Sequence, residues 1–298
     1  MKDRSKLTTE RRNPATAGID RRSALEIVNI INRQDRLVIP AVAKENKHIA
    51  TAVEMIVRSF LSGGRLFYVG AGTSGRLGVL DATECPPTYG VSRSLVQGII
   101  AGGRRALVRS VEGAEDKACD GAAALVAKKI KPADTVVGIA ACGLTPFVRR
   151  AMKKARQAGA ATVFVTCAPE AKKEINADVI INPVVGPEAI TGSTRMKAGT
   201  ATKLVLNTLT TAAMIKTGKV YGNLMVDLRA TNNKLQDRSE RIIMEVTALP
   251  RPAARRLLKA ANGRVKAAIV MHCKKTGLKN AQKILNQSGG LLRKAIER

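Results

Sequence analysis

Aromatic side chains are scarce in this sequence: they make up 2% of its 298 residues, and tryptophan is absent. Hydrophobic residues still account for 45% of the chain, so a core has to be built mainly from Ala, Val, Ile and Leu. Side chains of this kind favour helices packed closely on a parallel sheet. The length leaves room for one large domain, or for a main domain with a smaller companion.

Long apolar runs are missing as well. No stretch of about 18 apolar residues occurs, so we expect no membrane-spanning helix. Residues 1–6 are polar and charged, so we expect no secretory signal at this end of the sequence. The five cysteines are scattered and there are only two histidines, so we expect neither a disulfide framework nor a metal site. These absences favour a cytoplasmic protein, and no motif indicates a cofactor.

Acidic residues are few, since 23 Asp and Glu stand against 51 Lys and Arg, a formal net charge of +28. Such a charge is typical of proteins that bind nucleic acid. However, the basic residues are spread over stretches such as 149–154 and 255–259, with no aromatic residues among them to stack on bases. We therefore favour a generally basic surface that attracts anionic substrates, and keep a nucleic-acid partner as the alternative.

The hydrophobic pattern changes several times along the chain. Residues 1–22 are polar and without period, whereas 23–61 carry apolar residues at helical spacing and predict two helices. Five short apolar runs have the composition of buried strands: 65–69, 95–100, 135–140, 161–166 and 177–181. Helices are predicted between them at 115–128 and 146–158, and a long one follows at 196–216. This alternation predicts an α/β fold with a doubly wound parallel sheet.

The predicted strands stop after Tyr221. Residues 232–298 show only short amphipathic helices, and 241–298 carry fourteen Lys and Arg against two Asp and Glu. We expect a small helical module here, joined through a turn at Gly222-Asn223. The predicted organisation is an N-terminal arm with helices at 1–54, a sheet domain at 55–220 and a C-terminal helical module at 221–298.

Three loops rich in glycine and hydroxyl residues follow predicted strands and open helices. They are Gly70-Ala71-Gly72-Thr73-Ser74-Gly75-Arg76, Cys142-Gly143-Leu144-Thr145-Pro146 and Thr191-Gly192-Ser193-Thr194-Arg195. Helix N-termini bind anions, and the carboxyl ends of parallel strands meet in one crevice. The first loop lacks the Gly-Lys-Ser/Thr ending of a Walker loop, and no convincing acidic residue follows to complete a dinucleotide motif.

We therefore predict a phosphate site at these loops, with ordinary strand-to-helix turns as the alternative. Its candidate ligand-binding residues are Gly72, Thr73, Ser74, Cys142, Gly143, Thr145, Thr191 and Ser193.

Two carboxylates lie near these loops in the sequence. Glu84 precedes the Pro86-Pro87 pair, which predicts a rigid turn, and Glu115 begins a predicted helix. Both positions have ordinary explanations: a solvated loop residue for Glu84, and a charge favoured at a helix N-terminus for Glu115. Acid/base catalysis is the other interpretation, because two positioned carboxylates can exchange protons with a substrate. The spacing alone leaves both interpretations open.

Longer blocks of sequence give the chain a family resemblance. They are 70–78 (GAGTSGRLG), 81–90 (DATECPPTYG), 111–116 (VEGAED), 191–200 (TGSTRMKAGT), 222–227 (GNLMVD) and the opening 7–14 (LTTERRNP). They closely resemble the N-acetylmuramic acid 6-phosphate etherases, over essentially the whole chain. The related glucokinase regulatory proteins share some of these loops but are much longer.

This resemblance implies a sugar isomerase (SIS) domain at roughly 55–220, a homodimer, and cleavage of the D-lactyl ether of N-acetylmuramic acid 6-phosphate in the recycling of cell-wall sugars. By the motif match, Glu84 corresponds to the family's proton donor and Glu115 to its second catalytic carboxylate. The expected ligand is a phosphorylated amino sugar, with neither metal nor cofactor. The alternative is a regulatory protein of the same fold that binds a sugar phosphate without cleaving it.

The second loop departs from the family pattern, which usually reads Ala-Ser-Gly-Arg-Thr-Pro. Here Cys142 and Leu144 replace the serine and the arginine. A thiol is a weaker hydrogen-bond donor than a hydroxyl, and leucine removes a cation. We expect weakened or retuned phosphate binding, or a changed sugar preference. The alternative for Cys142 is a small core residue without contact to the ligand.

Overall fold

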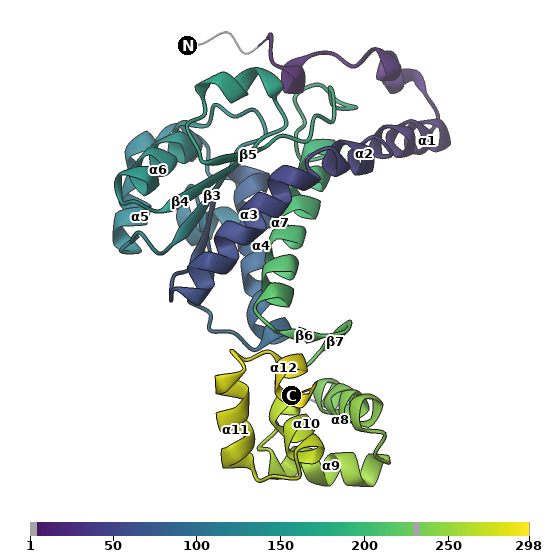
Figure 1. The fold of residues 1–298 in the computed structure, drawn as a ribbon. Coiled ribbons are helices and arrows are strands. Elements are labelled where there is room, and N and C mark those ends of the chain that lie inside the picture. The colour runs from purple at the N-terminus through teal and green to yellow at the C-terminus, as the bar shows by residue number, and fades with distance from the viewer. Residues whose placement is uncertain (1–4, 229–232, 298) are drawn as a thin grey trace. The chain divides into compact units, whose positions relative to one another are not determined.

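The computed structural model describes residues 5–228 and 233–297, which divide into two units (Figure 1). The first unit comprises the chain up to Ala82 together with Ser94–Thr210, and the second comprises Thr83–Arg93 together with the chain from Thr211 onward. Within the described ranges, no helix is long and apolar enough to cross a bilayer.

The first unit is built on a five-stranded parallel sheet with the order β2-β1-β3-β4-β5. The strands are β1 (Leu66–Gly70), β2 (Val96–Ile100), β3 (Thr135–Ile139), β4 (Ala161–Val165) and β5 (Val179–Ile181). Every residue of β1 and β3 is buried, because helices cover both faces and both strands are flanked by neighbours. The predicted α/β fold with a doubly wound parallel sheet is confirmed.

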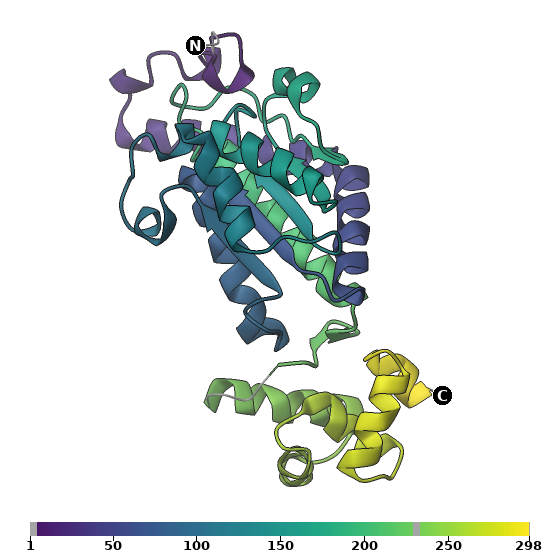
Figure 2. The ribbon, with the colours of Figure 1, turned by 90° about the vertical axis from the view of Figure 1, so that its left-hand side faces the viewer.

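Helices lie on both faces of this sheet (Figure 2). Those of the first unit, or beginning in it, are α1 (Ala24–Asp35), α2 (Val38–Ala43), α3 (Asn46–Leu61), α4 (Gly72–Tyr89), α5 (Ala118–Ala127), α6 (Pro146–Gln157) and α7 (Lys197–Lys216). Helices α5 and α6 share one core with the sheet, which contains Phe67, Phe147 and Phe164. The segment 23–61, predicted as two helices, forms three, because turns at residues 36–37 and 44–45 interrupt it.

Asp81 joins three elements on the α4 face of the sheet. Its buried carboxylate accepts hydrogen bonds from the Tyr68 hydroxyl at 2.9 Å, the Asn207 side chain at 2.6 Å and the Thr210 hydroxyl at 3.2 Å. Burial raises the pKa of Asp81 above its ordinary value, while these three donors oppose the rise. The carboxylate therefore holds the middle of α4 against β1 and α7.

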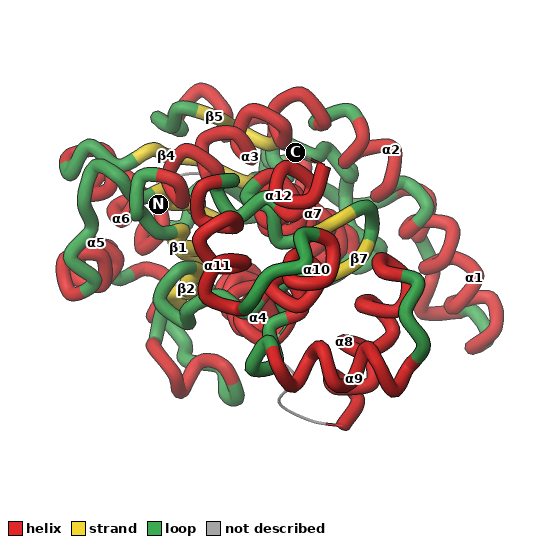
Figure 3. Tube along the Cα trace, turned by 60° about the horizontal axis from the view of Figure 1, so that its bottom comes forward, coloured by secondary structure: helices red, strands yellow, loops and turns green. Residues whose placement is uncertain are grey.

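The second unit is helical, with a small hairpin (Figure 3). Its helices are α8 (Asn233–Thr247), α9 (Arg251–Ala260), α10 (Val265–Cys273), α11 (Leu278–Gln287) and α12 (Leu292–Glu297). Helix α10 contacts all the others and is the centre of a separate apolar core. The expectation that strands stop after Tyr221 is wrong: β6 (Val220–Tyr221) pairs with β7 (Leu224–Met225) across Gly222-Asn223. Two-residue strands are too short to give a periodic signal.

The rigid turn predicted at the two prolines is also wrong. Helix α4 continues through Pro86 and Pro87 to Tyr89, so Glu84 lies on a helix and not in a loop. Each proline removes one backbone donor. The helix nevertheless closes around them, since the N–H of Gly90 donates to the carbonyl of Pro86 at 2.9 Å. Gly90, with φ of 64°, then ends it.

Candidate functional site

A cavity of about 260 Å³ lies at the carboxyl ends of β1 and β3 in the first unit. Five of the predicted ligand-binding residues line it: Gly72, Thr73, Ser74, Cys142 and Thr145. The predicted carboxylate Glu115 lines it too, as do Gly192 and Thr194 of the third loop. The predicted residues Gly143, Thr191 and Ser193 are not among its lining residues.

The first loop is held tightly by two glycines. A Cβ on Gly70 would lie 2.6 Å from the backbone nitrogen of Gly75, and a Cβ on Gly75 would lie 2.8 Å from the carbonyl oxygen of Gly70. The end of β1 and the first turn of α4 therefore approach more closely than any residue with a side chain allows. The first backbone N–H groups of α4, at Gly72, Thr73 and Ser74, have no acceptor one turn earlier in a helix that begins there. Such N–H groups bind anions.

The second loop leads into α6, which begins at Pro146. Cys142 and Thr145 face the cavity, and Gly143 turns away from it. With φ of +73°, Gly143 packs against the segment after β4, where an added Cβ would lie 2.4 Å from the Cβ of Ala171. Gly143 therefore shapes the loop by fitting between two segments.

The third loop differs because its helix N-terminus is already occupied. Glu188 is almost completely buried and accepts hydrogen bonds from the backbone N–H groups of Lys197 at 3.0 Å and Ala198 at 2.9 Å. Burial raises the pKa of Glu188 and lowers that of Lys197, whose Nζ donates to Gln34 at 2.9 Å. The start of α7 is capped by this carboxylate, so the open helix N-termini at the cavity are those of α4 and α6.

The two predicted carboxylates lie in different units. Glu115 lies in the short 3₁₀ turn Ala114–Asp116, which Gly113 sets up with φ of 70°, and its exposed side chain lines the cavity. Glu84 is exposed on α4 within the second unit and is not one of the cavity's lining residues.

Glu10 is a further carboxylate of the cavity, and it was not among the predicted site residues. It belongs to the N-terminal arm, which the polar pattern predicted only as an arm or extended segment. The arm forms three 3₁₀ turns, Thr8–Glu10, Pro14–Thr16 and Ile19–Arg21. The signal available in the sequence was the family-like opening block 7–14.

The cavity has an unusual charge distribution for a phosphate site. Two glutamates line it, and of the residues that the structure describes no lysine or arginine does so. A bound phosphate would thus be held by backbone N–H groups and hydroxyls, which is the chemistry of helix N-termini. Across residues 5–228 and 233–297, no group of three or more His, Cys, Asp or Glu side chains is placed to hold a metal ion.

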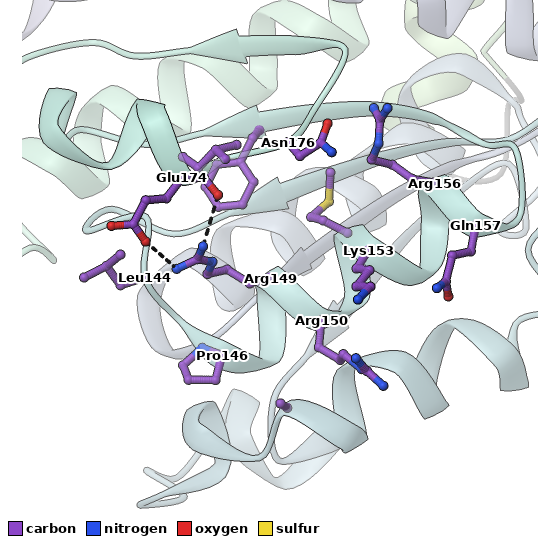
Figure 4. Close-up of a pocket in the computed structure, with 13 residues that line it drawn as sticks. Leu144, Pro146, Arg149, Arg150, Lys153, Arg156, Gln157, Glu174 and Asn176 are labelled. Carbon is purple, nitrogen blue, oxygen red and sulfur yellow. Dashed lines mark hydrogen bonds and ion pairs between the residues drawn. The ribbon is translucent and has the colours of Figure 1, made fainter. Parts of the chain in front are cut away.

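A larger cavity of about 580 Å³ lies beside α6, with an apolar floor and a cationic rim (Figure 4). Arg149 is paired with Glu174 at 3.1 Å, and Arg156 with Asp178 at 2.9 Å. Pro146 lines both cavities, so the second loop separates them. Neither Glu10 nor Glu115 lines the larger cavity, whose lining glutamate, Glu174, is paired with Arg149, so we assign the phosphosugar site to the smaller cavity.

Known proteins match this chain over part or all of its length. The family model of the glucokinase regulatory protein N-terminal SIS domain matches residues 48–156. An N-acetylmuramic acid 6-phosphate etherase of Synechocystis sp. is 50% identical over 100% of this chain and 97% of that protein. Another, of Clostridium botulinum, is 54% identical over 98% of this chain and 97% of that protein.

The chain belongs to the N-acetylmuramic acid 6-phosphate etherase family. This confirms the resemblance inferred from the sequence. Among solved structures, a phosphoheptose isomerase from Francisella tularensis is 14% identical, covering 65% of this chain and all of that one with a TM-score of 0.49. In this etherase-family chain, the blocks 70–78 and 111–116 that carried the resemblance supply the cavity with its glycine loop and with Glu115.

Cys142 gives a direct test of the second loop in this etherase-family chain. We expect Cys142→Ser to tighten binding of N-acetylglucosamine 6-phosphate about 3- to 10-fold, because a hydroxyl donates a stronger hydrogen bond than a thiol. Isothermal titration calorimetry measures the change. Cys119→Ser is the matched control, because Cys119 is exposed and does not line the cavity. Equal or weaker binding by Cys142→Ser would assign Cys142 to packing alone.

Proposed function

We propose that this protein cleaves the D-lactyl ether at C3 of N-acetylmuramic acid 6-phosphate, giving N-acetylglucosamine 6-phosphate and D-lactate in amino-sugar catabolism. The observation that carries this proposal is Glu115 in a cavity shared with the N-termini of α4 and α6. Family membership over the whole chain supports the same reaction.

The chemistry requires one base and one acid. In the open-chain sugar, the hydrogen on C2 lies next to the C1 aldehyde, so a carboxylate can remove it. Loss of the lactate oxygen from C3 follows, and that oxygen needs a proton. Water then adds to C3 of the unsaturated aldehyde, and C2 regains a proton, so the net reaction consumes one water. We assign the base at C2 to Glu115, which lines the cavity, and the acid toward lactate to Glu84, for which the motif match is the only support.

The phosphate supplies orientation. Held by the N–H groups of Gly72–Ser74 and by the hydroxyls of Thr73, Ser74 and Thr145, it would anchor the sugar at the end of the cavity away from the reacting carbons. Binding energy from such a remote group is spent on positioning the reacting atoms. We further propose a cytoplasmic homodimer, in line with the family resemblance.

Release of D-lactate from N-acetylmuramic acid 6-phosphate tests the function. Turnover with stoichiometric formation of N-acetylglucosamine 6-phosphate supports an etherase. Binding of both phosphosugars without release of lactate would instead support the alternative, a regulatory protein of the same fold.

Replacement of Glu84 tests its separate role. We expect Glu84→Gln to lower lactate release by about 10²–10⁴-fold, because an amide cannot deliver the proton that the leaving oxygen needs. Binding of N-acetylglucosamine 6-phosphate should stay unchanged. Glu54→Gln is the control, since Glu54 is likewise an exposed carboxylate on a helix. A normal rate of lactate release in Glu84→Gln would show that Glu84 is a solvated surface residue without a role in catalysis.

A further inference from the structure

The N-terminal arm is fixed to the sheet domain immediately before Glu10. Leu7, Thr8 and Thr9 are buried. The Thr8 hydroxyl donates to Glu170 at 2.6 Å, and the Thr8 backbone N–H donates to the same carboxylate at 3.3 Å. These bonds link the arm to the segment that follows β4.

The arm is fixed again immediately after Glu10. The side chain of Asn13 donates to the carbonyl of Pro187 at 3.0 Å, and the Thr16 hydroxyl donates to the carbonyl of Ala189 at 2.9 Å. Glu10 therefore lies between two anchored points, and its position in the cavity is set by both. None of these anchoring bonds uses the Glu10 side chain.

The Glu10 carboxylate reaches the third loop at Gly192. A Cβ built on Gly192 would lie 3.2 Å from Oε2 of Glu10, so the absence of a side chain there leaves room for the carboxylate. Glu10 is half-buried and lines the cavity, and its carboxylate makes no hydrogen bond or ion pair with the described part of the chain; its backbone N–H donates to the carbonyl of Leu7. A carboxylate in such a place has acceptor capacity that the protein itself does not use.

The negative charge of Glu10 determines which part of a bound phosphosugar can lie next to its carboxylate. A phosphate and a carboxylate repel each other, and no described cation lines the cavity to separate them. The phosphate belongs at the N-termini of α4 and α6, where N–H groups are available. The sugar portion, with its hydroxyls and its acetamide N–H, offers the donors that a carboxylate binds.

We propose that Glu10 is a specificity residue, whose carboxylate accepts hydrogen bonds from the hydroxyl or acetamide N–H groups of the bound sugar. This proposal rests on the proposed function, since it assumes a phosphorylated amino sugar in the cavity. The arm anchored at Thr8, Asn13 and Thr16 is then part of the substrate site and presents this carboxylate to it.

Paired titrations of Glu10→Gln test the proposal. We expect the affinity for N-acetylglucosamine 6-phosphate to fall about 10-fold or more, because a charge-assisted hydrogen bond is lost. The affinity for inorganic phosphate should stay the same or rise, since phosphate does not reach Glu10 and one nearby negative charge is removed. Glu10→Asp keeps the negative charge, so its affinity for N-acetylglucosamine 6-phosphate should fall less than that of Glu10→Gln. Asp20→Asn, an exposed carboxylate of the same arm, is the control and should match the unmodified protein.

Two results would overturn the proposal. Equal weakening of phosphate and phosphosugar binding would show that Glu10 only supports the fold of the arm, and unchanged binding of both would show that it does not contact the sugar. These titrations measure ligand binding and do not depend on catalysis. If the protein released no lactate, the etherase proposal would be refuted, but the titrations would still test whether Glu10 binds the sugar. If the protein does release lactate, Glu10→Gln should mainly raise KM for N-acetylmuramic acid 6-phosphate and should lower kcat only slightly.

Discussion

Replacing Glu115 by glutamine is expected to lower D-lactate release by about 10²–10⁴-fold while leaving phosphosugar binding nearly unchanged. Glutamine keeps the size of the side chain and its place in the cavity, but it cannot accept the proton from C2. The exposed position of Glu115 on a short 3₁₀ turn means that the substitution removes no core packing. Steady-state lactate release and calorimetric binding of N-acetylglucosamine 6-phosphate together measure the effect.

Glu112→Gln is the matched control for Glu115→Gln. Glu112 is an exposed glutamate on the same segment, hydrogen-bonded to the Ser110 hydroxyl, and it does not line the cavity. Its replacement should leave the rate unchanged. Exchange of the substrate C2 hydrogen in D₂O separates the two catalytic roles: it should disappear in Glu115→Gln and persist in Glu84→Gln. The opposite pattern would exchange the assignments of base and acid, and full activity in Glu115→Gln would remove that residue from the mechanism.

The fold could be predicted from the sequence because its strands are buried on both faces. A run such as Thr135–Ile139 is apolar at nearly every position, so it stands out without any knowledge of its partners. The hairpin at Val220–Met225 and the course of α4 through Pro86 could not be predicted in this way. The two strands of the hairpin have only two residues each, and the proline pair favours a turn at a place where the chain is helical.

The candidate site could be predicted in part, for a related reason. Glycine loops at strand ends point to an anion site whatever surrounds them, and Thr73 and Thr145 do line the cavity. Glu10 gave no such signal, because its place depends on bonds from its neighbours to Glu170, Pro187 and Ala189, which are distant in sequence. Likewise, nothing local in the third loop shows that a buried glutamate already caps its helix.

The phosphate loop gives the second large expected effect. A methyl group on Gly75 would lie 2.6 Å from Cγ1 of Ile100 and 2.8 Å from the carbonyl oxygen of Gly70. The carbonyl belongs to the backbone at the end of β1 and cannot rotate away, so Gly75→Ala must displace the first turn of α4. We expect the affinity for N-acetylglucosamine 6-phosphate to fall at least ~10-fold, since the N–H groups no longer converge on the phosphate. Overpacking should also lower the free energy of unfolding by about 1–3 kcal/mol.

Gly199→Ala separates this geometric effect from the general effect of an added methyl group near the cavity. Gly199 lies in α7, where a Cβ would meet the carbonyl oxygen of Thr194 at 3.5 Å and Cγ2 of Thr73 at 3.6 Å, which are ordinary contacts. Its replacement should leave phosphosugar affinity unchanged and stabilise the helix by up to about 1 kcal/mol. Urea unfolding and calorimetric titration of both variants measure the difference. Unchanged affinity in Gly75→Ala would mean that the α4 N-terminus does not hold the phosphate, and the anion would then have to be assigned to α6 alone.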